Sequence, residues 1–126
     1  MSNNQKNCSC SGAPTLIFAC SGAAEVGAIA DQAARKLSAA GKGKMFCLAG
    51  VGGKVDGIMK TTAAAENILA IDGCPLNCVK HTLEQAGFNK FRHLRLAELG
   101  MVKGQATATA ENIAAAVAAA EVELSK

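Results

Sequence analysis

Residues 68–74 read Ile-Leu-Ala-Ile-Asp-Gly-Cys, an apolar run that ends in an aspartate, a glycine and a cysteine. A nearly continuous apolar run is typical of a strand that is buried on both faces of a parallel sheet. Two other short β-like segments, at 15–20 and 44–47, also end in a cysteine. The sequence therefore predicts three strands that each end at a thiol.

The spacing of these three cysteines is regular. Cys20, Cys47 and Cys74 are separated by 27 positions in each interval. A strand–helix unit that repeats in a parallel sheet brings the same end of each strand to the same edge. We therefore expect the three thiols at one sheet edge, with Cys78 one helical turn beyond Cys74.

Four strand–helix units account for the chain after its polar start. Strands are predicted at 15–20, 44–48, 67–71 and 90–96, and helices at 23–40, 55–64, 75–86 and 109–124. Gly41 and Gly87 are expected to end two of the helices, because glycine readily adopts the left-handed cap conformation. The alternation predicts an α/β fold of three layers, with a four-stranded, mostly parallel sheet and helices on both faces.

The cysteines also favour one strand order. Neighbouring strands lie about 4.8 Å apart, so strands separated by another strand lie about 10 Å apart. Thiolates around one zinc ion are roughly 3.7 Å apart, as follows from a Zn–S bond of about 2.3 Å. The first strand should therefore lie between the second and the third. We predict the order 2-1-3-4, with the site at the switch point where open α/β sheets bind ligands.

Composition limits the class of protein. Residues 14–126 are expected to form a single domain, after a flexible polar tail at 1–13 that carries Cys8 and Cys10. The net charge of +3 is not gathered in one basic block, which argues against nucleic acid as a partner. No run reaches the ~18 apolar residues of a membrane span. Because no signal peptide is seen, we expect a cytoplasmic protein with reduced thiols.

Residues 74–78 form a Cys-x3-Cys pair at the start of a predicted helix. Pro75 suits the first helical position, where its missing N–H costs nothing. The helix N-terminus is expected to favour thiolate over thiol at both cysteines. Taken singly, Cys20 or Cys47 fits a small apolar core residue better than a ligand.

Three sequence blocks resemble the DGC family, small proteins named for an Asp-Gly-Cys signature and identified as zinc-binding from their cysteines. The blocks are residues 71–78 (Ile-Asp-Gly-Cys-Pro-Leu-Asn-Cys), residues 20–27 with Asp31 and Arg35 after them, and residues 45–50. The resemblance covers about 15–100. It implies that Cys20, Cys47, Cys74 and Cys78 are zinc ligands, and it implies no established reaction.

Five further residues carry groups that suit a site. Cys8 and Cys10 fit a flexible segment or a second thiol pair, and Asp72 fits either a turn or a group that orients a ligand or accepts loop N–H bonds. His81 lies roughly 10 Å along the helix axis from Cys74, too far for a direct ligand. His93 is expected to be a packed or surface residue.

These observations favour a protein that holds one zinc ion in a structural, sensing or metal-handling role. The alternative is a thiol-redox or sulfur-carrier protein that uses Cys74 and Cys78. An iron–sulfur cluster or another soft metal would also suit four cysteines. An unidentified protein or a thiol redox protein could be the partner, and enzymatic activity is left open. If all four cysteines share one ion, Cys47→Ser and Cys74→Ser should lower zinc content equally.

Overall fold

The computed structural model describes residues 14–126; the predicted tail with Cys8 and Cys10 lies outside them. Its strands are β1 (Thr15–Ala19), β2 (Lys44–Met45), β3 (Asn67–Asp72) and β4 (Arg92–Arg95). They form one sheet in the order β2-β1-β3-β4, and all three neighbouring pairs are parallel. The predicted order 2-1-3-4 is confirmed.

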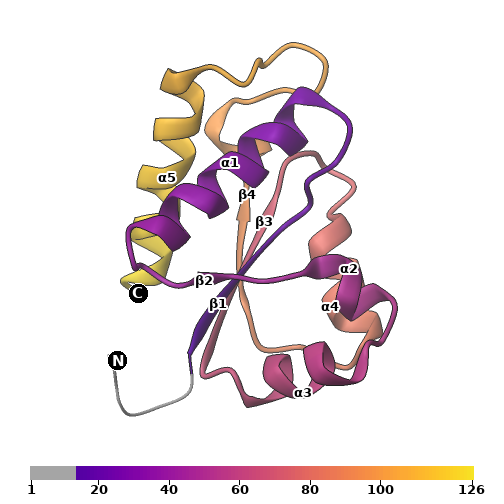
Figure 1. Cartoon of the computed structure of the whole chain (residues 1–126). Helices are drawn as coiled ribbons and strands as arrows, with labels where there is room; N and C mark the ends of the chain where they lie inside the picture. The colour runs from indigo at the N-terminus through magenta and orange to yellow at the C-terminus, as the bar shows by residue number, and fades with distance from the viewer. Residues whose placement is uncertain (1–13) are drawn as a thin grey trace.

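The helices cover both faces of this sheet. They are α1 (Glu25–Ala39), α2 (Leu48–Gly52), α3 (Asp56–Ala64), α4 (Cys78–Gln85) and α5 (Ala110–Leu124), with a 3₁₀ helix at Leu96–Leu99. In Figure 1, α1 and α5 lie on one side of the strands and α2, α3 and α4 on the other. The predicted three-layer α/β fold is confirmed. None of the helices within residues 14–126 has the length and apolar character needed to cross a membrane.

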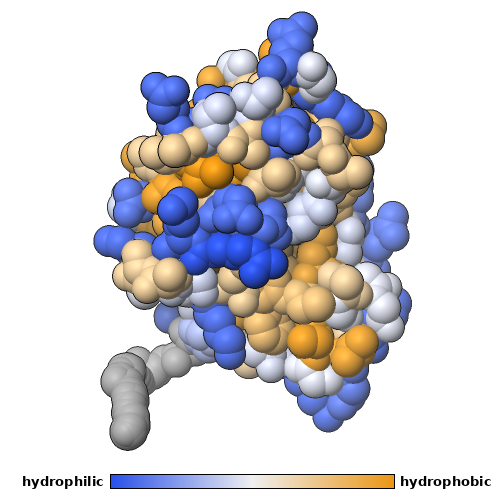
Figure 2. Space-filling model, turned by 45° about the horizontal axis from the view of Figure 1, so that its top comes forward, coloured by the Kyte–Doolittle hydropathy of each residue, from blue (hydrophilic) through white to orange (hydrophobic). Residues whose placement is uncertain are grey.

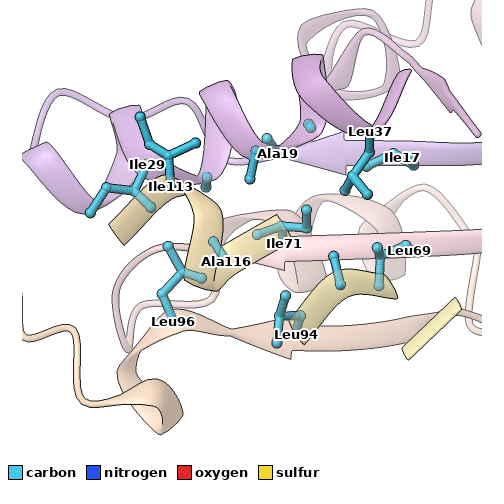
Figure 3. Packing of buried hydrophobic residues seen from close by; sticks show 14 of the residues in the cluster. Ile17, Ala19, Ile29, Leu37, Leu69, Ile71, Leu94, Leu96, Ile113 and Ala116 are labelled. Atoms are coloured by element: carbon cyan, nitrogen blue, oxygen red, sulfur yellow. The ribbon is translucent and has the colours of Figure 1, made fainter. Parts of the chain in front are cut away.

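The pleat of β1 sends successive side chains into two separate cores. Ile17 and Ala19 face α1 and α5, where they pack in the cluster that Figure 3 shows with Leu37, Leu69 and others. Leu16 and Phe18 face the opposite side and pack in the cluster that includes residues of α2 and α4. Because β1 and β3 are buried on both faces, their carboxyl ends have fixed positions at the upper edge in Figure 1.

The strand predicted at 44–48 is shorter than expected. β2 has two residues, and Cys47 does not end a strand but caps the N-terminus of α2, a segment for which a loop is predicted. The Cys47 Sγ accepts an N–H from Gly50 at 3.3 Å. Val51 is fully buried, so apolar contact with the sheet stabilises a helical turn in this glycine-rich segment.

The helix predicted at 75–86 begins later, at Cys78. Pro75 therefore lies in a turn before the helix, and the Asn77 N–H donates to the Cys74 carbonyl at 3.3 Å to close that turn. Asn77 has a left-handed backbone, with φ of 56°. The predicted start is too early because proline is equally suited to the second position of a turn.

Candidate metal centre

Three of the four predicted ligands lie around one cavity. Cys20 directly follows β1, Cys74 follows β3, and Cys78 is the first residue of α4. All three line a cavity of about 150 Å³, together with Asp72, Lys103 and the first turn of α1. Among residues 14–126, the lining of this cavity does not include His81, in agreement with its expected distance from the site.

Cys47 lies in a neighbouring region. It lines two wider cavities of about 600 and 530 Å³, and the second of these also contacts Cys20. Cys20 is thus common to the two groups of cysteines. The four thiols are free. Over residues 14–126, no three Cys, His, Asp or Glu side chains already stand as a ready ligand group for a metal ion.

Backbone N–H groups hold two of the sulfur atoms. Gly73 donates to the Cys20 Sγ at 3.3 Å, and Gly50 donates to the Cys47 Sγ at 3.3 Å. The Cys20 N–H in turn donates to the Ile71 carbonyl at 3.1 Å, which extends the β1–β3 pairing to the site. These bonds fix the positions of the two sulfur atoms relative to the backbone.

Two glycines allow close backbone contacts in the segments that carry Cys20 and Cys74. A Cβ on Gly73 would lie 2.5 Å from the Val26 carbonyl oxygen, and a Cβ on Gly27 would lie 2.5 Å from backbone atoms of Gly22. Only glycine fits without movement, since both neighbours are backbone. The glycine of the Asp-Gly-Cys segment therefore brings the β3–α4 connection against the start of α1.

Asp72 fixes the start of α4. Its carboxylate is 1% exposed and accepts N–H bonds from Val79 at 2.8 Å and Lys80 at 3.2 Å. It also pairs with the His93 Nε2 at 2.7 Å. Acceptance of backbone N–H bonds is one of the roles that the sequence predicts for Asp72. The pairing with His93 was missed, although β4 beside β3 places His93 opposite Ala70, on the same face as Asp72.

The environment of Cys78 differs from the expectation. Burial raises the pKa of the Cys78 thiol, and the charges of Asp72, Cys74 and Cys20 raise it further, while Lys103 acts in the opposite direction. The expected preference for thiolate at this helix start is therefore wrong for Cys78. The Asp72 carboxylate, which accepts N–H bonds at the start of α4, is the second cause of the raised pKa. Its negative charge opposes the stabilisation of a thiolate that was expected from the helix N-terminus.

Asn77, in the turn before α4, carries an unsatisfied polar group. Its Oδ1 is buried and, within the part of the chain that the structure describes, has no hydrogen-bond partner. Buried polar atoms without a partner are rare and mark strain, a water or an ion site. The atom lies in the turn between Cys74 and Cys78, where Asn77 itself has a left-handed backbone conformation.

A polar cluster borders the second cavity of Cys47. The Ser21 hydroxyl donates to Asp31 at 2.7 Å, and the Arg35 guanidinium donates to the same carboxylate at 2.6 Å. The bond from Arg35 lowers the pKa of Asp31. This cluster ties the turn after β1, where Ser21 has φ of 51°, to α1. It thereby holds the backbone next to Cys20.

The model of the DGC domain matches residues 16–120, which include all four cysteines. The chain belongs to the DGC domain family. AnvM, the anaerobic and virulence modulator of Pseudomonas aeruginosa (strain PAO1), is 41% identical over 88 residues, which make up 70% of this chain and 67% of AnvM. No solved structure matches the chain. The family match extends beyond the 15–100 covered by the resemblance, as far as α5.

Proposed function

We propose that this DGC domain holds one zinc ion through the thiolates of Cys20, Cys47, Cys74 and Cys78, at the edge where β1 and β3 end. The observation that carries the proposal is the cavity shared by Cys20, Cys74 and Cys78, which meets Cys47 through Cys20. The fold thus brings together thiols from residues that are far apart in the sequence.

The donor set suits zinc. Four cysteine thiolates are a common ligand set for structural zinc, and soft thiolates also favour other soft metals. The position supports the same assignment, because open α/β sheets bind ligands where the strand order reverses, here between β1 and β3. The unpaired Oδ1 of Asn77 is a further mark of a functional site in this turn.

A site closed by four thiolates fits a structural, sensing or metal-handling role better than hydrolysis, which needs an open coordination position. The name of AnvM, anaerobic and virulence modulator, agrees with a sensing role in the family. Zinc thiolates respond to oxidants, which gives such a sensor a chemical basis. We place this function in the cytoplasm, where the cysteines would stay reduced.

The thiol-redox alternative has less support. A redox or sulfur-carrier protein needs a nucleophilic thiolate near neutral pH. The raised pKa of Cys78 keeps that thiol protonated when no metal is bound. Cys78 would therefore be a poor attacking group for Cys74, although either could still serve as a metal ligand.

Metal analysis and a visible spectrum of protein prepared without oxygen test the proposal. We expect a colourless protein with about one zinc per chain, since d¹⁰ zinc has no visible bands. A brown protein that contains iron and sulfide would instead indicate a cluster. Thiol–disulfide turnover by protein free of metal would support the alternative and contradict the zinc proposal.

A further inference from the structure

We infer that the four thiols are unequal: Cys20, Cys74 and Cys78 form the permanent part of the site, and Cys47 is the ligand that detaches during metal exchange. The inference rests on the proposed function and specifies how the site would handle its metal. It differs from the expectation, drawn from spacing alone, that all four cysteines contribute equally.

The cavities divide the cysteines into three and one. Cys20, Cys74 and Cys78 enclose the small cavity of about 150 Å³, whereas Cys47 lines the two wide ones. Cys47 thus lies next to this group of three, and Cys20 is the cysteine that lines both the small cavity and one of the wide ones.

The backbone segments that carry the cysteines differ in the same way. β1 and β3 are central strands that pair over five residues, and the tight contact of Gly73 with Val26 holds the end of β3 against the start of α1. Cys47 follows β2, an edge strand that pairs over two residues, and caps the five-residue α2. Short edge elements open locally at lower free energy than central strands do. The Cys47 segment can therefore move while the other three cysteines stay in place.

The Cys47 sulfur has a backbone hydrogen-bond partner besides the proposed metal. The Gly50 N–H already donates to this Sγ at 3.3 Å. On exchange, the Cys47 sulfur would keep the electron pair of its bond to the metal and would take up the proton that an incoming thiol loses. Charge and atoms would balance without an oxidant or reductant.

Two matched substitutions test this division. Zinc-loaded wild-type protein, Cys47→Ser and Cys74→Ser are compared for zinc per chain after gel filtration and for the rate of zinc release to a colorimetric chelator. We expect Cys47→Ser to keep about one zinc per chain and to release it on the order of tenfold faster than the wild type. Cys74→Ser should retain far less than one zinc per chain.

Either of two results would overturn the inference: Cys47→Ser loses its zinc as fully as Cys74→Ser does, or it releases zinc at the wild-type rate. Circular dichroism checks that each variant is folded, and a variant that is not is replaced by the alanine substitution at the same position. Absence of zinc from the wild-type protein would refute the proposed function instead.

Sodium arsenite tests the three-thiol group without zinc. Arsenite loses its three hydroxyls as water while three thiols bind the arsenic, which stays trivalent, and soft thiolates suit this ion. Calorimetric titration should show equal affinity for the wild type and Cys47→Ser, and a clear loss for Cys74→Ser. Equal losses in both variants would contradict the division into three and one, whatever the zinc content.

Discussion

Asp72 connects the two cysteines of the Asp-Gly-Cys segment through the backbone. It ends β3 just before Cys74, and it accepts the Val79 and Lys80 N–H groups just after Cys78. One carboxylate therefore sets where the turn begins and where α4 starts. Its pairing with His93 adds β4 to the same hydrogen-bonded group.

Asp72→Asn should lower the free energy of unfolding by about 1–3 kcal/mol, because a buried carboxylate that accepts three bonds is replaced by an amide with one acceptor oxygen. Urea denaturation measures the change. Asp56→Asn is the matched control, since Asp56 is 83% exposed and its ion pair with Lys60 is worth at most about 0.5 kcal/mol. Equal effects at both positions would mean that Asp72 does not brace the start of α4.

Cys78 should make the zinc affinity depend on pH. Its pKa is raised, so the thiol is protonated at neutral pH and must lose that proton when it binds a metal. The apparent zinc affinity should therefore increase as pH rises, and zinc should dissociate on acidification. Asp72→Asn removes a charge that raises this pKa, so it should shift the affinity curve to lower pH. Chelator competition at several pH values provides the measurement, and an affinity independent of pH would contradict the assignment.

At the scale of elements, the contact between α1 and the β3–α4 connection positions Cys20 and Cys74. The distances around Gly73 show that this contact is made between backbones: its nearest neighbours are the carbonyl group of Val26 and the amide of Gly27. No side-chain rotation can make room for a methyl group there.

Gly73→Ala should destabilise the fold by about 1–3 kcal/mol, because the added Cβ forces backbone apart. Gly57→Ala is the control: Gly57 lies in α3, where an added methyl would meet nothing within 4 Å, so the substitution should stabilise the helix by about 0.5–1 kcal/mol. Thermal unfolding of both variants reports the difference. A stable Gly73→Ala with unchanged zinc content would show that this contact is not needed for the site.

Elements with local signals could be predicted from the sequence. The Thr109 hydroxyl caps α5 by accepting the Asn112 N–H at 3.1 Å, and Gly41 ends α1 with φ of 76°. The start of α4 and the existence of α2 could not, because they depend on contacts from elsewhere. Asp72 supplies the cap of α4 from β3, and the buried Val51 makes a helix of a glycine-rich stretch.

At the scale of the whole molecule, topology explains why the site could be located before its geometry was known. Parallel strands with a regular repeat bring their ends to one edge, and that alone places Cys20 beside Cys74. The same reasoning could not predict that Cys47 lies apart from the other three cysteines. It follows from the short β2, which ends at Met45, and from α2, which begins directly after Cys47 and takes this residue as its N-cap.

The surface around this edge offers a mixture of side chains. In Figure 2, which brings the upper edge of Figure 1 forward, hydrophobic and hydrophilic residues alternate over short distances, and the face in view is not uniformly of one kind. The chemistry that distinguishes this edge is therefore its thiols, which we propose as metal ligands.

X-ray absorption at the zinc edge of protein purified without oxygen tests that claim most directly, because it counts the atoms bound to the metal. The proposed site predicts four sulfur neighbours at about 2.3 Å. A first shell made mainly of nitrogen or oxygen at about 2.0–2.1 Å would contradict the account, since the thiols of this edge would then not be the ligands.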